Sequence, residues 1–166
     1  MFKNLSKFDI RKAMTEVDMS PELGPKARIL VRPATEANPN YYNAMLALSG
    51  KRVRAMVKTD RITAEDAALN RDDDVQLYPR YVIAGWSGIE ADAEPGSEGV
   101  DENGHVIFNR RAAEQLCVAL NEQAPHLMDK LRNTAATTER FYAEDEIAPP
   151  DAEELAGNSE GDSSSS

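Results

Sequence analysis

One apolar run restricts the fold of this chain more than any other part of its sequence. It extends from Tyr81 to Ile89, includes the tetrapeptide Gly-Trp-Ser-Gly, and contains Trp86, the only tryptophan. The chain is otherwise strongly polar, with 29% charged residues, so a solvated loop does not account for such a run. We expect the run either to lie in the hydrophobic core or to contact a partner.

Length and composition indicate one compact domain. The chain has 166 residues, and a hydrophobic fraction of 41% suffices for a modest core. No apolar stretch approaches the roughly 20 residues that span a bilayer, and the N-terminus leads into charged residues instead of a signal sequence. Cys117 is the only cysteine, which excludes an intrachain disulfide and a thiolate metal cluster. We therefore expect a soluble, intracellular protein without membrane contact.

The charge is distributed unevenly along the chain. Residues 1 to 58 carry 11 Lys/Arg and 5 Asp/Glu, whereas residues 141 to 166 carry 8 Asp/Glu and no Lys/Arg. The net charge is −10 and the pI is about 4.7. A protein of this charge is repelled from nucleic acid at long range. Charge alone therefore favours protein partners and argues against nucleic acid.

Capping residues and apolar spacing predict a mainly α-helical fold. Asn38 and Pro39 are typical of a helix start, and that helix is expected to continue towards Lys58. The charges of residues 72 to 74 suit the positive end of a helix dipole, which predicts a helix from there towards Trp86. The predicted helices begin near Lys7, Asn38, Thr63, Asp72, Asn109 and Pro125. The first of them is expected to end near Val17.

A short strand element and an acidic tail complete the prediction. Residues 27 to 32 alternate as in a strand, and residues 17 to 20 could pair with them in a short N-terminal β-hairpin. Residues 90 to 104 are typical of a solvated loop. Residues 143 to 166 are too polar to offset the entropy of ordering, which predicts a disordered, acidic, Ser-rich tail. The expected organisation is a single, mainly helical domain over residues 1 to 142, followed by this tail.

The sequence contains no recognisable catalytic constellation. His105 and His126 lack neighbours at metal-ligand spacing, and neither a phosphate-binding glycine loop nor a nucleophile elbow is present. Cys117 falls at the helical spacing of apolar residues, which favours a core position over a nucleophile. Adjacent helical carboxylates such as Asp72 and Asp73 point in different directions, so a helix start is favoured over a cation site. We therefore predict a non-enzymatic protein without metal or cofactor.

Basic residues gather in the second half of the helix predicted to start at Asn38. Lys51, Arg52, Arg54 and Lys58 could follow a phosphate backbone, but no aromatic residues are interleaved with them for base stacking. A solvated helix face, or a docking face for an acidic partner, is the favoured interpretation.

Several segments together resemble one known family. They are Met1 to Leu5, Phe8 to Ala13, Val31 to Pro33, Leu77 to Ile89, the helix start Asn109-Arg110 with Leu116 and Leu120, and Glu153 to Ser159. They resemble the tail assembly chaperones of long-tailed, siphovirus-type bacteriophages, over most of the chain. The apolar run into Gly-Trp-Ser-Gly-Ile, followed by an acidic loop and an Asn-capped helix, is the most specific part. The loop from Ala91 to Gly99 is longer and more acidic than the family pattern.

The resemblance implies a non-enzymatic role in the host cell cytoplasm. Such proteins bind the long apolar helices of the tape measure protein, keep it soluble, and help tail tube protein subunits to polymerise around it. They are absent from the mature virion, and in this family a programmed ribosomal frameshift often produces a longer second form. A small helical domain with apolar and aromatic side chains is compatible with helix-in-groove recognition.

The expected partner-binding residues come from the apolar run and the basic helix. They are Tyr81, Trp86, Ile89, Lys51, Arg52 and Arg54. For Trp86, a position in the core remains the alternative to a partner contact. Two other functions also remain open: a small structural virion protein, such as a connector or tail component, and an acidic regulator that binds a host protein. Self-association is left open as well.

Overall fold

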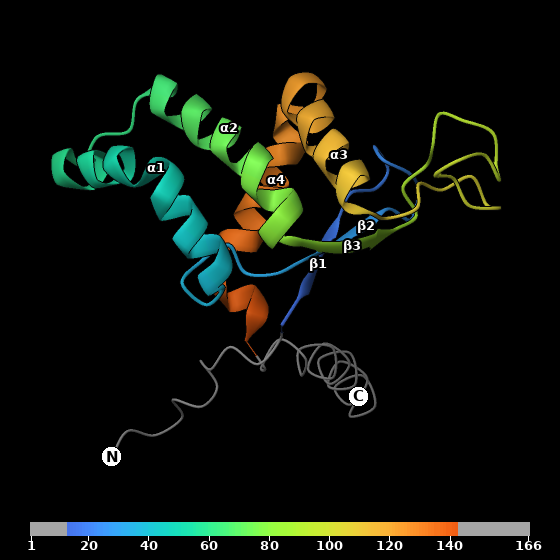
Figure 1. Cartoon of the computed structure of the whole chain (residues 1–166), viewed down its shortest axis with the longest axis horizontal. Helices are drawn as coiled ribbons and strands as arrows, with labels where there is room; N and C mark the ends of the chain where they lie inside the picture. The colour runs from blue at the N-terminus through green and yellow to red at the C-terminus, as the bar shows by residue number, and fades with distance from the viewer. Residues whose placement is uncertain (1–12, 143–166) are drawn as a thin grey trace, which may run out of the picture.

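A small antiparallel sheet lies beneath a layer of helices in the computed structural model, which describes residues 13 to 142 (Figure 1). The strands are β1 (Thr15–Asp18), β2 (Arg28–Val31) and β3 (Ile83–Ser87), in the order β1-β2-β3. The helices are α1 (Pro39–Thr59), α2 (Ala64–Tyr81), α3 (Arg110–Gln123), α4 (Pro125–Ala136) and the 3₁₀ helix η2 (Thr138–Phe141). The predicted mainly helical fold with a short N-terminal β-hairpin is confirmed.

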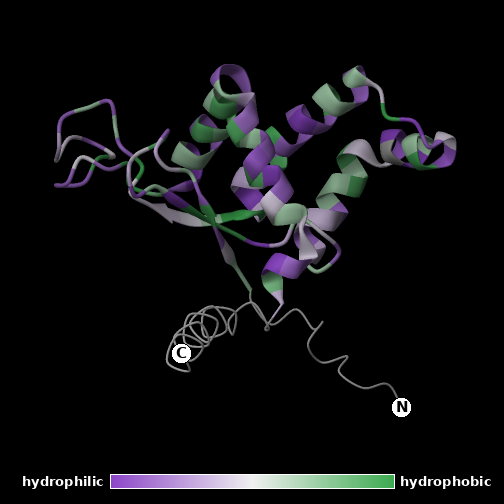
Figure 2. Ribbon diagram, turned by 180° about the vertical axis from the view of Figure 1, so that it is seen from behind, coloured by the Kyte–Doolittle hydropathy of each residue, from purple (hydrophilic) through white to green (hydrophobic). Residues whose placement is uncertain are grey.

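The sheet contributes one apolar face to the core. Ile29 pairs with Trp86 and Val31 pairs with Ile83, with a register shift between these two pairs. Side chains on a strand alternate between faces, so Ile83 and Trp86, which are three residues apart, would otherwise point in opposite directions. The bulge brings both onto the face of Ile29 and Val31. Figure 2 shows hydrophobic residues concentrated where the strands pass beneath the helices.

Helix α1 begins where the sequence predicted. The Asn38 side chain accepts a hydrogen bond from the Tyr41 backbone N–H, and Pro39 occupies the first turn. The helix bends partway along its length (Figure 1). Ser49 Oγ donates to the Met45 carbonyl at 2.9 Å and Gly50 follows it, a combination that bends helices. Residues 50 to 69, here called the arm, therefore extend away from the sheet.

Helix α2 differs from the prediction at both ends. It begins after Thr63, whose capping box with Asp66 is present as expected, and it continues without interruption through residues 72 to 74. The predicted helix start at Asp72 is therefore wrong. The helix ends at Tyr81, and β3 begins at Ile83. The predicted continuation to Trp86 is also wrong, because pairing with β2 gives the apolar run an extended conformation.

Helices α3 and α4 follow the prediction closely. Asn109 caps α3 by accepting a hydrogen bond from the Ala112 backbone N–H at 2.8 Å, and Pro125 occupies the first turn of α4. Their apolar faces enter the core as expected. The buried residues are Ala113, Cys117 and Leu120 from α3, and Leu127, Met128, Leu131 and Ala135 from α4.

Three further predictions concern the ends of the domain and its longest loop. Val17 lies in β1, so the helix predicted up to Val17 is wrong there, while residues 7 to 12 lie outside the described residues. The loop after residue 90 is more structured than predicted, since Glu90 bridges to His105 and the buried Val100 bridges to Val106. The tail predicted for residues 143 to 166 lies outside the described residues, so its disorder remains a prediction.

Candidate docking groove

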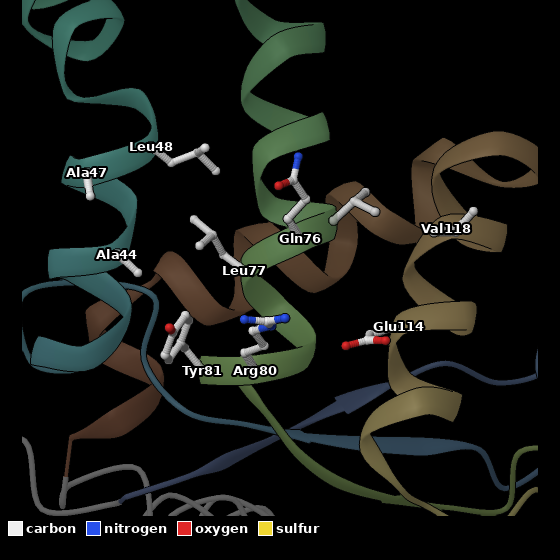
Figure 3. A pocket seen from close by; sticks show the side chains of 10 residues that line it. Ala44, Ala47, Leu48, Gln76, Leu77, Arg80, Tyr81, Glu114 and Val118 are labelled. Carbon is white, nitrogen blue, oxygen red and sulfur yellow. The ribbon is translucent and has the colours of Figure 1, made fainter.

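A groove of about 680 Å³ runs along the outer side of α2, between α1 and α3 (Figure 3). Helix α2 forms its floor, and the two neighbouring helices form its walls. The lining residues are Ala44, Ala47 and Leu48 from α1, Val75, Gln76, Leu77, Arg80 and Tyr81 from α2, and Glu114 and Val118 from α3.

The groove walls expose apolar side chains to solvent. Leu48 is 45% exposed on the α1 wall and Val118 is 44% exposed on the α3 wall, while Leu77 is buried in the floor between them. Ala44 and Ala47 have small side chains and leave space along the α1 wall. Exposed branched side chains on both walls of one groove supply apolar surface that a partner could cover.

The end of the groove nearer the sheet is polar. Figure 3 shows Arg80, Tyr81 and Glu114 at this end and Leu48 farther from the sheet. Arg80 and Glu114 are both exposed. A second hollow of about 320 Å³ on α3 shares Glu114 and Val118 with the groove, so the accessible surface continues across α3.

A buried polar network fixes the helices beneath the groove. Asp74 is only 8% exposed, and its carboxylate accepts hydrogen bonds from Tyr41 Oη at 2.9 Å and Arg132 Nε at 2.8 Å. Arg132 also donates to Asp129 at 3.2 Å, and Asp129 accepts from Arg71 at 3.1 Å. The network joins α1, α2 and α4. Within the described residues, every buried side-chain nitrogen and oxygen has a hydrogen-bond partner.

The electrostatics of this network follow from its burial. Desolvation raises the pKa of the Asp74 carboxyl, against the opposing effect of the Arg132 guanidinium. Desolvation also raises the pKa of Tyr41, and the negative charge of Asp74 acts in the same direction. Hydrogen bonds from Arg71 lower the pKa of Asp129. A fully paired network of this kind has a positioning role, because it holds α1 and α4 at fixed places on α2.

Of the three apolar-run residues predicted to bind a partner, only Tyr81 lines the groove. Trp86 is half-buried against the core, donates from Nε1 to the Val106 carbonyl at 2.8 Å, and packs edge-to-face on Phe108 with ring centroids 4.9 Å apart. Ile89 is 5% exposed. The structure therefore places Ile89 in the core, and it packs both Trp86 and Tyr81 against the core, with Tyr81 also lining the groove.

The three predicted basic residues lie on the arm, beyond the groove. The Arg52 guanidinium donates to Asn70 Oδ1 at 3.2 Å and to the carboxylate of Asp73. This contact links α1 to α2, so Arg52 has a structural role. Lys51 and Arg54 are exposed.

Sequence reasoning missed the two residues that form the exposed groove walls, Leu48 and Val118. Each lies in an unbroken apolar stretch, residues 44 to 48 and residues 116 to 120. A helix that is apolar around more than one face has more apolar surface than one core contact buries. That signal was available in the sequence, although it does not indicate which helices lie side by side.

Two observations concern metal binding and the single thiol. No group of three or more His, Cys, Asp or Glu side chains between residues 13 and 142 is arranged to hold a metal ion. Burial raises the pKa of the Cys117 thiol to about 12, which keeps it protonated at neutral pH.

Among the helices of the described part, none is both long and apolar enough to cross a membrane.

In comparisons with known proteins, no family model, curated protein or solved structure matches this chain.

Proposed function

We propose that this chain is a bacteriophage tail assembly chaperone that binds an apolar helical segment of the tape measure protein in the groove between α1, α2 and α3. In this role it is a non-enzymatic protein of the host cytoplasm. It keeps the tape measure protein soluble, promotes polymerisation of the tail tube protein around it, and is absent from the mature virion. The sequence resemblance supplies the identity of the partner. The exposed apolar walls formed by Leu48 and Val118 are the structural observation that supports binding.

The lining of the groove suits a helical ligand. A helix presents apolar side chains at positions i, i+3 or i+4, and i+7, and such a row inserts into an apolar groove. Leu48 and Val118 would contact the two sides of the row, and Leu77 would lie beneath it. The small side chains of Ala44 and Ala47 permit close approach of the ligand backbone on the α1 side.

The polar end of the groove would determine the direction of the bound helix. Arg80 and Glu114 present opposite charges at the end nearer the sheet. Complementary charges across an interface contribute to orientation and specificity more than to affinity. A bound helix with a polar or charged residue at one end and apolar residues at the other fits this arrangement.

Co-expression with the tape measure protein tests the proposal directly. The wild-type chain is expected to keep the tape measure protein in the soluble fraction and to co-purify with it. The double variant Leu48→Arg/Val118→Arg should lose both effects, because it replaces the apolar contacts of both walls with charged side chains that resist desolvation. Both positions are exposed in the free chain, at 45% and 44%, so the fold should remain intact.

Ile107→Arg is the matched control, because Ile107 is 49% exposed but does not line the groove. This variant should co-purify like the wild type. An insoluble tape measure protein in the presence of the wild-type chain would contradict the chaperone function. Unchanged co-purification of the double variant would contradict the groove as its site.

Purified virions provide an independent test. Mass spectrometry of mature particles should not detect the chain in structural amounts. Its presence there would favour a structural tail or connector protein. A pull-down from infected cells that recovers a host protein instead of the tape measure protein would favour an acidic regulator.

A further inference from the structure

The arm carries a row of cationic side chains along one side of α1. Lys51, Arg54 and Lys58 are spaced three and four residues apart, so they lie on one helix face. All three are exposed, and no ion pair between described residues involves them. Arg52, by contrast, is paired with Asp73. Lys51, Arg54 and Lys58 are here called the cationic row.

Exposed apolar side chains lie beside the cationic row. Val57 is 77% exposed next to Lys58, and Ile62 is 72% exposed in the connection to α2. They are the two most exposed large apolar side chains among the described residues. A ligand for this surface therefore needs both negative charge and some apolar side chains.

The C-terminal segment of the same chain has this composition. Residues 143 to 166 contain eight Asp/Glu and no Lys/Arg. Ile147 and Leu155 are interspersed among the acidic residues. Opposite charges favour association, and the attachment of the segment to the domain raises its effective concentration to about the millimolar range. A contact with a dissociation constant below about 1 mM is therefore formed in most molecules.

The segment is long enough to reach the arm. The Ala34 N–H donates to the Ala135 carbonyl, so the end of α4 lies beside the chain that leads into α1. The 21 residues of α1 correspond to about 31 Å of helix, so the cationic row at residues 51 to 58 lies within about 31 Å of the start of α1. A chain of 24 residues spans at most about 80 Å when it is fully extended. The arm is therefore within reach.

Another pair of cationic residues lies closer to the start of the segment, but nearby carboxylates already offset its positive charge. Lys130 and Arg140 share a hollow of about 360 Å³ with Glu16 and Asp18. These two carboxylates reduce the positive potential there. None of the ion pairs between described residues involves the cationic row, although Asp60 follows Lys58 by two residues.

We propose that the acidic C-terminal segment, residues 143 to 166, binds the cationic row of the same molecule. The contact places the segment at the arm, next to Val57 and Ile62. This inference concerns the free chain alone and does not depend on the proposed chaperone function.

A spin label on the full-length chain tests the contact. Ser159→Cys provides the attachment site, because the native Cys117 is fully buried and does not compete for the label. At about 50 mM salt, the ¹⁵N-amide signals of residues 51 to 62 should lose intensity at least about twofold, and at about 500 mM salt they should recover, because salt screens exposed charges. Absence of broadening at low salt, or broadening that salt does not reduce, would overturn the proposal.

Two matched triple variants localise the contact. Lys51→Gln/Arg54→Gln/Lys58→Gln removes the charge of the row and keeps a good helix former at each position, so the broadening should disappear. Lys26→Gln/Arg110→Gln/Arg111→Gln removes three exposed cations elsewhere, and the broadening should persist. Equal broadening in both triple variants would contradict binding at the row.

A mixing experiment separates contact within one molecule from contact between two. Unlabelled ¹⁵N protein is mixed with spin-labelled protein at natural isotope abundance. The ¹⁵N signals should remain sharp, since the labelled segment binds its own arm. Broadening in the mixture comparable to that in the singly labelled chain would assign the contact to a second copy and overturn the intramolecular proposal.

Discussion

Tyr41 and Asp74 are joined by a buried hydrogen bond of 2.9 Å that connects α1 to α2 beneath the groove. Arg132 from α4 donates to the other carboxylate oxygen at 2.8 Å. The Tyr41 ring also meets Tyr78 edge-to-face, with centroids 5.8 Å apart. Three helices therefore meet at one carboxylate, and this contact helps to hold the α1 wall of the groove against α2.

Tyr41→Phe should destabilise the protein. The variant keeps the aromatic packing on Tyr78 but removes a donor from a carboxylate that is only 8% exposed. Loss of one partner from a buried charged acceptor costs about 1 to 3 kcal/mol in the free energy of unfolding. Urea denaturation followed by far-UV circular dichroism measures this cost. Tyr42→Phe, at the neighbouring half-buried position, should change the free energy of unfolding by less than about 0.5 kcal/mol. Equal effects of the two variants would refute the role of this hydrogen bond.

Local signals in the sequence were sufficient to locate most of the helices. Asn38, Thr63 and Asn109 each cap a helix as predicted, because a cap depends on residues within one turn. Asp74 shows where local reasoning fails. Its charge looked like part of a helix start, but its partner Arg132 lies 58 residues away in the sequence. The sequence alone does not indicate such a partner.

Strand β3 and the groove could not be predicted from the sequence for a similar reason. The run from Ile83 to Trp86 has enough apolar residues for a buried helix or a strand, and only its pairing with β2 decides between them. The apolar stretches around Leu48 and Val118 indicated surplus apolar surface. Their positions on facing walls depend on how α1 and α3 pack against α2, which is a property of the tertiary fold.

Gly88→Ala should destabilise the protein strongly. The backbone at this position requires glycine, which explains the second glycine of Gly-Trp-Ser-Gly. Gly88 has φ +69°, and a Cβ atom there would lie 2.5 Å from the Lys26 carbonyl oxygen. Because that oxygen belongs to the backbone, relief requires a shift of the main chain. Strain and displacement together should cost about 2 kcal/mol or more in the free energy of unfolding.

Gly85→Ala is the matched control for this prediction. A Cβ atom at Gly85 would meet Leu30 Cδ1 at 3.8 Å, an ordinary van der Waals contact. Its cost should therefore stay below about 1 kcal/mol. Denaturation followed by the fluorescence of Trp86, the only tryptophan, compares the two variants. A Gly88→Ala variant as stable as Gly85→Ala would show that the backbone approach to Lys26 is not a constraint.

Asp129→Asn should reduce stability at neutral pH but not in acid. Hydrogen bonds from Arg71 hold the pKa of Asp129 below its ordinary value of 3.8. A carboxyl group with a lowered folded-state pKa stabilises the fold above its unfolded pKa, and this stabilisation is lost as the pH falls through the folded value. The Asp129 side chain is 39% exposed, so screening limits the difference between wild type and variant at pH 7 to about 1 kcal/mol or less.

The pH series for this prediction compares unfolding free energies from pH 7 to pH 2. The difference between wild type and Asp129→Asn should narrow below about pH 4, where the unfolded carboxyl becomes protonated. Asp92→Asn is the control, because Asp92 is exposed in the loop after β3 and none of the ion pairs recorded among described residues includes it. A difference that stays constant across the series would mean that the Arg71 contact does not favour the ionised form.

Cys117 should be almost unreactive in the folded protein. Its side chain is fully buried in α3, and burial raises its thiol pKa from 9.0 to about 12. Only the thiolate attacks alkylating agents and disulfides, so at pH 8 the reaction rate should be on the order of 10² to 10³ times lower than in denaturant. Gln115→Cys places a second thiol on the exposed side of the same helix, and this thiol should react at a rate close to that of the unfolded chain. Rapid labelling of Cys117 in the folded wild type would show that α3 separates readily from the core, and the wall that Val118 contributes to the groove would then not be fixed in place.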